Sequence, residues 1–332
     1  MRVAILDDYQ DVALVSAPWA ELGAGVHVVR FTDHVRDVGE LARRLQDFDV
    51  LVLMRERTPV TAELLARLPK LRLITTTGMA NAAIDLAAAA RHGVTVCGTR
   101  RGTNAAAELA WALVMAVARD IPANDRDVRA GLWQRRIGVD LEGATLGLLG
   151  LGRFGTKMAG YAKAFGMDIL AWSPNLTPER AAAGGAVPVG KEDLFRRSDI
   201  VSIHLRHSES TRALVGRKEL DLLGSEGRLV NTSRGPIVQE NELVQALRER
   251  RIAAAALDVY DVEPLPADSP LRDAPNVILS PHIGFVTKRA HRLGYTQMLE
   301  DIQAFRAGTP VNVLTWMENG AGHPGRSADP PG

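Results

Sequence analysis

Short apolar runs alternate along this chain with segments in which apolar residues recur every three or four positions. The runs are typical of buried parallel strands, and the periodic segments are typical of amphipathic helices. The alternation predicts an α/β fold built on largely parallel sheets. In the first third of the chain, the predicted strands are 3–6, 26–31, 50–54, 71–75 and 94–97, and the predicted helices are 40–46, 62–68 and 84–92.

A second series of strands and helices follows a longer helical stretch at 104–119, for which Asn104 is the predicted N-cap. Another long helical pattern runs from Phe285 to Arg306, and the tail from 319 to 332 is rich in Gly and Pro, which predicts disorder. The predicted strands of the second series are 144–149, 168–172, 200–205, 228–232, 253–259 and 276–280.

The apolar strand 144–149 runs directly into Gly150-Leu-Gly152-Arg-Phe-Gly155 and then into a helical pattern. A strand, this glycine turn and a helix together are typical of a dinucleotide-binding unit. Gly150 allows the tight turn, Gly152 lets the backbone approach a pyrophosphate, and Gly155 lets the helix lie close to the strand. The helix N-terminus then offers N–H groups and a positive dipole end to the phosphates.

We therefore expect two doubly wound α/β domains. A Rossmann dinucleotide-binding domain is predicted at 103–285, and a second domain is predicted to be discontinuous, formed by 1–102 and 286–318. A cleft between the two domains is then the expected ligand site.

Composition narrows the choice of function. The net charge of +1 gives no electrostatic reason to expect nucleic acid or an acidic membrane surface, and no apolar run approaches the roughly 20 residues of a membrane span. The single cysteine, Cys97, cannot form an internal disulfide, which favours a reducing, cytoplasmic compartment. No His, Asp and Glu cluster has metal-ligand spacing, so no metal is expected.

Three polar residues follow predicted strands of the second series. Arg234 lies in Asn-Thr-Ser-Arg-Gly, Glu263 in Asp-Val-Tyr-Asp-Val-Glu-Pro, and His282 in Pro-His-Ile-Gly. Because ligands bind at the carboxyl ends of parallel strands, all three are expected at the edge that carries the glycine turn. A cation, a carboxylate and an imidazole beside a nicotinamide are the groups that reduction of a 2-keto acid requires.

The four motifs, in this order, resemble those of the D-isomer-specific 2-hydroxyacid dehydrogenases, the family of glyoxylate/hydroxypyruvate reductases and phosphoglycerate dehydrogenases. The resemblance covers the chain from Met1 to about Asn312. It implies a flavodoxin-like substrate (lid) domain, and a homodimer formed through the nucleotide-binding domains. It also implies that Arg234 holds the substrate carboxylate, that His282 donates the proton, and that Glu263 orients and charges His282.

The chemistry of these side chains agrees with those roles. Arginine offers a planar fork of donors that matches a carboxylate, and histidine can protonate an oxygen near neutral pH. A neighbouring carboxylate favours the imidazolium and extends the acid form to higher pH. Taken singly, Arg234 could instead be a structural ion-pair partner, Glu263 an exposed turn residue, and His282 a surface histidine.

On the substrate side, the resemblance implies that the backbone around Gly78 and Met79 donates hydrogen bonds to the substrate carboxylate. Arg55, at another strand end, could reach the same pocket, although a solvent-facing loop arginine is an equal alternative.

The cofactor region departs from the family in two places. Ser173 stands where NAD-preferring members carry an acidic residue for the ribose 2′-hydroxyl, and Arg206 replaces a proline. We expect NAD or NADP as cofactor and slightly favour NADP, with Ser173, Arg206 and Asn175 around a 2′-phosphate. The alternative is that Ser173 bonds an unphosphorylated ribose and Arg206 stacks on adenine. The predicted cofactor-binding residues are Gly150, Gly152, Arg153, Phe154, Gly155, Ser173, Asn175, His204, Arg206, Thr232, Ser233, Asp258 and Gly284.

The predicted function is therefore hydride transfer between NAD(P)H and a small 2-keto acid such as glyoxylate or hydroxypyruvate, giving the D-2-hydroxy acid. A phosphoglycerate dehydrogenase-like enzyme is one alternative. An NAD(H)-sensing corepressor-like protein of the same fold is another, and turnover with glyoxylate or hydroxypyruvate would separate it from an enzyme.

Overall fold

The structure is a computed structural model that describes residues 1–100 and 102–315. The chain forms two compact units, one from Met1 to Gly102 together with the chain from Lys288 onward, and one from Thr103 to Thr287. The tail predicted to be disordered, 319–332, lies outside the described residues. Among the described helices, none is both long and apolar enough to cross a membrane.

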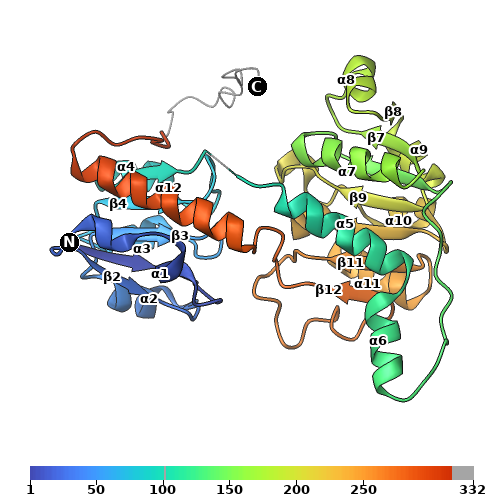
Figure 1. Cartoon of the computed structure of the whole chain (residues 1–332), viewed down its shortest axis with the longest axis horizontal. Helices are drawn as coiled ribbons and strands as arrows, with labels where there is room; N and C mark the ends of the chain where they lie inside the picture. Colours follow the sequence, from blue (N-terminus) through green and yellow to red (C-terminus); the bar gives the residue numbers. More distant parts are fainter. Residues whose placement is uncertain (101, 316–332) are drawn as a thin grey trace. The chain divides into compact units, whose positions relative to one another are not determined.

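The first unit is a five-stranded parallel sheet in the order β2-β1-β3-β4-β5, the flavodoxin-like order. The helices α2, α3 and α4 cover one face, and α1 and α12 lie over the other, where Figure 1 shows α12 crossing in front of the sheet. The strands are β1 (Arg2–Ile5), β2 (His27–Arg30), β3 (Val50–Leu53), β4 (Leu73–Thr76) and β5 (Thr95–Gly98). The helices are α1 (Ala13–Ser16), the 3₁₀ turn η1 (Trp19–Leu22), α2 (Val38–Leu45), α3 (Ala62–Ala66), α4 (Leu86–Arg91) and α12 (Lys288–Arg306).

Local sequence explains where several of these helices begin. Asp37, Thr61 and Asp85 each accept a hydrogen bond from the backbone N–H three residues later, which satisfies a donor that the first turn leaves unpaired. After α12 the chain returns to the sheet edge, where the Leu314 N–H donates to the Val96 carbonyl at 2.8 Å. The last described residues therefore extend the sheet beside β5.

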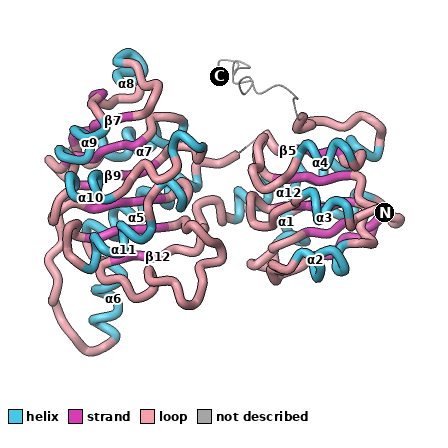
Figure 2. Tube along the Cα trace, turned by 180° about the vertical axis from the view of Figure 1, so that it is seen from behind, coloured by secondary structure: helices cyan, strands magenta, loops and turns pink. Residues whose placement is uncertain are grey.

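The second unit is a seven-stranded parallel sheet in the order β12-β11-β10-β9-β6-β7-β8. Its six strands from β11 to β8 have the 3-2-1-4-5-6 Rossmann order, which reverses direction between β6 and β9. The strands, magenta in Figure 2, are β6 (Thr145–Leu149), β7 (Asp168–Trp172), β8 (Val187–Pro188), β9 (Ile200–Ile203), β10 (Arg228–Asn231), β11 (Ala254–Leu257) and β12 (Val277–Leu279).

Alternate strand residues point to opposite faces, so the sheet has two apolar cores. One core packs against α5, α7 and α8, and the other packs against α9, α10 and α11. The helices are α5 (Ala105–Ala118), α6 (Ile121–Arg129), α7 (Arg153–Ala164), α8 (Pro178–Ala183), α9 (Lys191–Arg197), α10 (Arg217–Leu223) and α11 (Glu240–Arg248), with 3₁₀ turns η2 (Glu209–Thr211) and η3 (Gly235–Ile237).

The predicted N-cap position of Asn104 is confirmed, but its side chain does not cap the helix. Asn104 stands at the N-cap position of α5, but its side chain accepts no hydrogen bond from the helix. Its Oδ1 instead accepts from Nη2 of Arg153, at 3.2 Å, because the start of α7 brings that guanidinium within reach. Asn104 thus links the first turn of α5 to the first turn of α7.

Candidate active site

The glycine turn joins β6 to α7 at the point where the strand order reverses. Gly150 has φ of 108°, and a Cβ there would lie 2.8 Å from the carbonyl carbon of His204. A Cβ on Gly155 would lie 2.1 Å from the Gly150 carbonyl oxygen, so the close contact between turn and helix requires glycine. A Cβ on Gly152, by contrast, would meet nothing within 4 Å, and the backbone at the N-terminus of α7 is open to a ligand. This geometry fits a bound pyrophosphate.

Two further loops border this turn. After β7, Ser173 is partly exposed, and the carbonyl of Asn175 accepts a hydrogen bond from Nη1 of Arg180 at 2.9 Å. After β9, the exposed Arg206 contributes its carbonyl to a 2.8 Å bond from the Thr211 hydroxyl. Arg180 was not among the predicted residues, because the sequence gives no sign that the first turn of α8 folds back onto this loop.

His204 follows β9 and bonds to its own strand. Burial lowers its pKa to about 4, since the protonated ring would lose its hydration without gaining a counter-ion. Its Nε2 lies 2.8 Å from the Ser202 hydroxyl, within the same strand end. With its pKa lowered in this way, His204 is poorly suited to donate a proton near neutral pH.

Arg234 follows β10 in a loop that its own neighbours shape. Asn231 accepts from the Ser233 N–H and donates from its side chain to the Arg234 carbonyl, both at 3.0 Å. The Ser233 hydroxyl donates to the Leu205 carbonyl, and Nη1 of Arg234 donates to the Ser233 carbonyl at 2.7 Å. The loop is thereby fixed at the carboxyl end of β10, with Thr232 at its first position.

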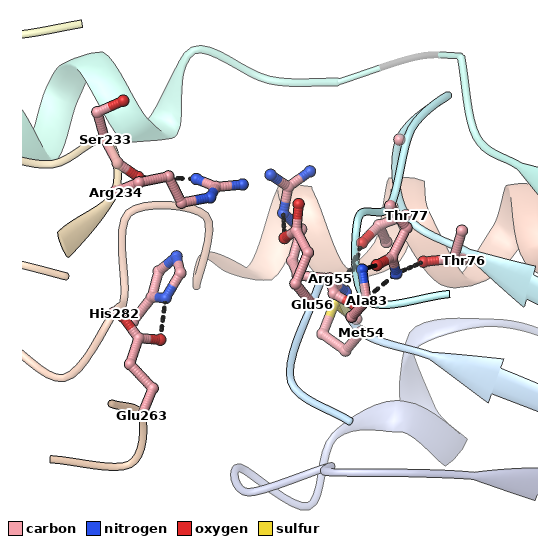
Figure 3. Close-up of polar contacts among 12 residues, drawn as sticks. Met54, Arg55, Glu56, Thr76, Thr77, Ala83, Ser233, Arg234, Glu263 and His282 are labelled. Atoms are coloured by element: carbon pink, nitrogen blue, oxygen red, sulfur yellow. Dashed lines mark hydrogen bonds and ion pairs between the residues drawn. The ribbon is translucent and has the colours of Figure 1, made fainter. Parts of the chain in front are cut away.

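Glu263 and His282 form a close pair. Nδ1 of His282 lies 2.5 Å from Oε2 of Glu263, and both side chains are partly buried. Oε1 of the same carboxylate accepts from the Tyr260 N–H at 3.0 Å, which fixes its orientation. In Figure 3 the Glu263 carboxylate lies against one edge of the imidazole, and Arg234 lies on the other side of the ring. With Nδ1 held, Nε2 is the ring atom that can transfer a proton.

Asp258 anchors the turn that carries His282. Its Oδ1 accepts from the Ser280 hydroxyl at 2.6 Å and from the Ile283 N–H at 2.9 Å, and its Oδ2 accepts from the Gly284 N–H at 2.9 Å. Asp258 is buried, and burial raises the pKa of its carboxyl group. These bonds hold residues on both sides of His282, whose φ of 53° is unusual for a non-glycine residue.

The first unit has its own polar edge, at the ends of β3 and β4. The Arg55 N–H donates to the Thr77 hydroxyl at 3.0 Å (Figure 3). The Arg55 carbonyl accepts from the Asn81 side chain at 2.8 Å. Nη1 of Arg55 is 3.2 Å from the position of a Cβ on Gly78. The Gly78 N–H donates to the Thr99 hydroxyl at 2.8 Å, and Met79 beside it is 36% exposed.

The predicted residues of the second unit lie at the carboxyl edge of one sheet, on loops after neighbouring strands or, for Arg153, Phe154 and Gly155, in the first turn of α7. A guanidinium can bind a carboxylate there, and an imidazole backed by a carboxylate can supply a proton, beside a turn suited to a dinucleotide. No group of three His, Cys, Asp or Glu side chains suited to a metal occurs in residues 1–100 and 102–315. The anchoring role of Asp258 and the loop-forming role of Asn231 were not predicted, although both stand at the ends of predicted strands.

Comparisons with known proteins agree with this reading of the motifs. The family profile described as D-isomer specific 2-hydroxyacid dehydrogenase, NAD binding domain, matches residues 111–284. A glyoxylate reductase of Aeropyrum pernix is 40% identical over 82% of this chain and 85% of that protein. A D-3-phosphoglycerate dehydrogenase of Archaeoglobus fulgidus is 36% identical over 82% of this chain, which spans only 52% of that protein.

Solved structures give the same result. A crystal structure of phosphoglycerate oxidoreductase from Vibrio cholerae o395 is similar with a TM-score of 0.87 and 37% identity, over 93% of this chain and 99% of that one. Both the sequence identity and the shared fold extend over most of the chain. The chain therefore belongs to the D-isomer specific 2-hydroxyacid dehydrogenase family and is an NAD-dependent oxidoreductase.

Proposed function

We propose that this enzyme reduces a small 2-keto acid, glyoxylate or hydroxypyruvate, reversibly to the D-2-hydroxy acid. The observation that carries the proposal is the 2.5 Å contact between His282 and Glu263, at the edge that also holds Arg234. Relatives named glyoxylate reductase, 38–40% identical and covered over 85–86% of their length, support this choice of substrate.

Each catalytic side chain has one task in this scheme. A nicotinamide held at the glycine turn would supply the hydride for the keto carbon. Arg234 binds the substrate carboxylate at two points, which orients the keto group. His282 stabilises the charge that develops on the keto oxygen and donates the Nε2 proton to it, so the C=O electron pair becomes an O–H bond. Glu263 is a positioning residue that holds Nδ1 and so orients the ring.

We assign substrate contacts in the first unit to Arg55, Gly78 and Met79. Gly78 and Met79 follow β4, and Arg55 follows the neighbouring β3, so the three lie at one edge of their own sheet. The Arg55 guanidinium lies beside Gly78 and is suited to a carboxylate oxygen. Because the Gly78 N–H donates to the Thr99 hydroxyl, the backbone donor assigned to the substrate is that of Met79.

Nicotinamide absorbance with a panel of 2-keto acids and D- and L-2-hydroxy acids tests the proposal. We expect turnover of glyoxylate or hydroxypyruvate and oxidation of D-2-hydroxy acids only. Binding of NADH without turnover of any acid would instead favour the corepressor-like alternative.

For the cofactor, we propose a modest preference for NADP. Ser173 and Asn175 carry no charge that would repel a 2′-phosphate, and Arg180, in the first turn of α8, adds a cation beside this loop. Arg206 is exposed after β9, two strands from β7 in the sheet. The test is the ratio of kcat/KM for NADPH and NADH, which Ser173→Asp should shift toward NADH. A strong NADH preference in the unaltered enzyme would refute the phosphate site.

We also propose a homodimer formed through the second unit. An apolar surface on α6 and the segment after it, here called the α6 arm, comprises Ile121, Val128, Leu132, Trp133 and Ile137, of which Trp133 is 74% and Ile137 96% exposed. Exposed apolar residues in such a cluster are typical of an interface. Light scattering after size exclusion should show a dimer that Trp133→Ser with Ile137→Ser converts to monomer.

We also propose a cytoplasmic location, because the chain has a single cysteine and cannot form an internal disulfide. Cys97 is buried, and burial raises the pKa of its thiol to about 12, so the thiol is unreactive in the folded protein. Fractionation of cells that express the tagged chain tests the location.

A further inference from the structure

The segment after β3 contains two arginines on either side of a glutamate, Arg55-Glu56-Arg57. It adjoins Gly78, to which the proposed function assigns substrate binding. Two guanidinium groups at this place would suit a doubly charged phosphate ester. The charges around each arginine therefore determine whether a phosphorylated substrate can bind here.

Arg57 packs against residues of the loop after β1. Its Nη1 donates to the Asp7 carbonyl at 2.6 Å, and its guanidinium lies 4.5 Å from the centroid of the Tyr9 ring. Burial lowers its pKa. The next residue, Thr58, donates to the Asp7 carboxylate at 2.5 Å. Arg57 therefore joins the loops after β1 and β3.

Arg55, unlike Arg57, is fixed through its backbone. Its backbone has φ of 59° and is fixed by bonds to Thr77 and Asn81, so the side chain starts from a constrained position. Its guanidinium lies beside Gly78. A ligand bound at the Gly78 loop would thus meet Arg55 in preference to Arg57.

Glu56 supplies a carboxylate at the same place. Its Oε2 lies 3.6 Å from Nε of Arg55, and the two side chains are 26% and 29% exposed (Figure 3). Being half-buried, this ion pair is screened less than one at the surface. The carboxylate compensates the charge of Arg55, and a dianion at Arg55 would also face the negative charge of Glu56.

We propose that Glu56 is a specificity-determining residue that excludes phosphorylated substrates, through its ion pair with Arg55 beside Gly78. The substrate class is then a 2-keto acid whose C3 carries hydrogen or a hydroxyl group, and not a phosphate ester. This inference rests on the proposed function and distinguishes between the two kinds of substrate that relatives of this chain are named for.

The test compares hydroxypyruvate with 3-phosphohydroxypyruvate, which differ only by the phosphate ester. We expect the unaltered enzyme to favour hydroxypyruvate in kcat/KM by at least about 100-fold. Glu56→Gln should shift that ratio at least tenfold toward the phosphorylated substrate. Glu56→Gln combined with Arg55→Met should lose the gain, because the Arg55 guanidinium is the group that would bind the phosphate.

Glu63→Gln is the matched control, since Glu63 is 60% exposed and pairs with Arg67 on α3, and it should leave the ratio unchanged. Equal use of both substrates by the unaltered enzyme would overturn this inference and leave the proposed function intact. An unchanged ratio in Glu56→Gln, with circular dichroism showing a folded protein, would overturn it too. Absence of turnover with any 2-keto acid would overturn the proposed function first. If Glu56→Gln fails to fold, the ratio in the unaltered enzyme and in Glu56→Asp decides the question.

Discussion

Nδ1 of His282 lies 2.5 Å from Oε2 of Glu263, although the two residues follow different strands of the sheet. The other oxygen of Glu263 accepts the Tyr260 N–H, so the carboxylate is fixed at both atoms. The imidazole is consequently oriented with Nε2 directed away from the carboxylate. This single relationship determines which ring atom can exchange a proton with a substrate.

Replacing Glu263 by Gln should lower kcat for reduction by at least about 100-fold. An amide presents an N–H group where the carboxylate presents its second oxygen, so it cannot hold both the Tyr260 N–H and Nδ1 of His282 as the carboxylate does. The measurement is kcat for reduction, with the exposed Glu226→Gln as control. An unchanged kcat would remove Glu263 from this role.

Replacing Asp258 by Asn should lower kcat by about 10- to 100-fold and the stability by roughly 1–3 kcal/mol. The carboxylate accepts three hydrogen bonds, and an amide would turn a donor toward the Ser280 hydroxyl or the backbone N–H groups of residues 283 and 284. Steady-state kinetics and thermal unfolding of the same preparation measure both effects. Activity equal to that of the unaltered enzyme would show that the turn around His282 needs no such anchor.

Replacing Arg234 by Lys should reduce kcat/KM by about 100-fold, with a large part of the effect in KM. An ammonium group keeps the charge but cannot offer two parallel donors to a carboxylate. Arg248→Lys, at the exposed end of α11, is the control and should behave like the unaltered enzyme. A KM that the Arg234→Lys exchange leaves unchanged would contradict carboxylate binding by this residue.

The fold could be predicted from the sequence because its signals are local. Apolar runs mark β3 and β10, and the glycine spacing marks the turn between β6 and α7. Strand ends could also be located, so the loops that carry Arg234 and His282 were expected at one edge. All of these inferences depend on residues that are close in the chain.

Other contacts of the site and of the core join residues that are far apart in the chain. The partners in these contacts could not be predicted. Asp258 bonds to Gly284, 26 residues later, and Thr75 bonds to Asp301, 226 residues later. Asn104 shows the same limit, because a guanidinium 49 residues away takes the oxygen that a helix cap would use. A sequence pattern indicates that a polar group stands at a strand end but not which distant group meets it.

Asp301 should make the stability of the protein depend on pH between about 4 and 6. Its carboxyl is fully buried between α12 and the sheet of the first unit, where it accepts hydrogen bonds from Thr75 and Asn312, both at 3.0 Å. Burial is the main cause that raises its pKa from 3.8 to about 6. A raised folded-state pKa means that the folded protein holds the proton more tightly than the unfolded chain does.

The contribution of Asp301 to stability is therefore fully present below pH 4 and is lost as the pH rises through 6. The loss amounts to about 3 kcal/mol, from a shift of roughly two pKa units at 1.4 kcal/mol each. Asp301→Asn keeps partners for Thr75 and Asn312 but does not titrate. Urea unfolding from pH 3.5 to 7.5 should show Asp301→Asn becoming more stable relative to the unaltered protein as the pH rises from 4 to 6. The exposed Asp273→Asn is the control. If the stability difference between Asp301→Asn and the unaltered protein stays constant with pH, Asp301 is ionised in the folded protein throughout this range.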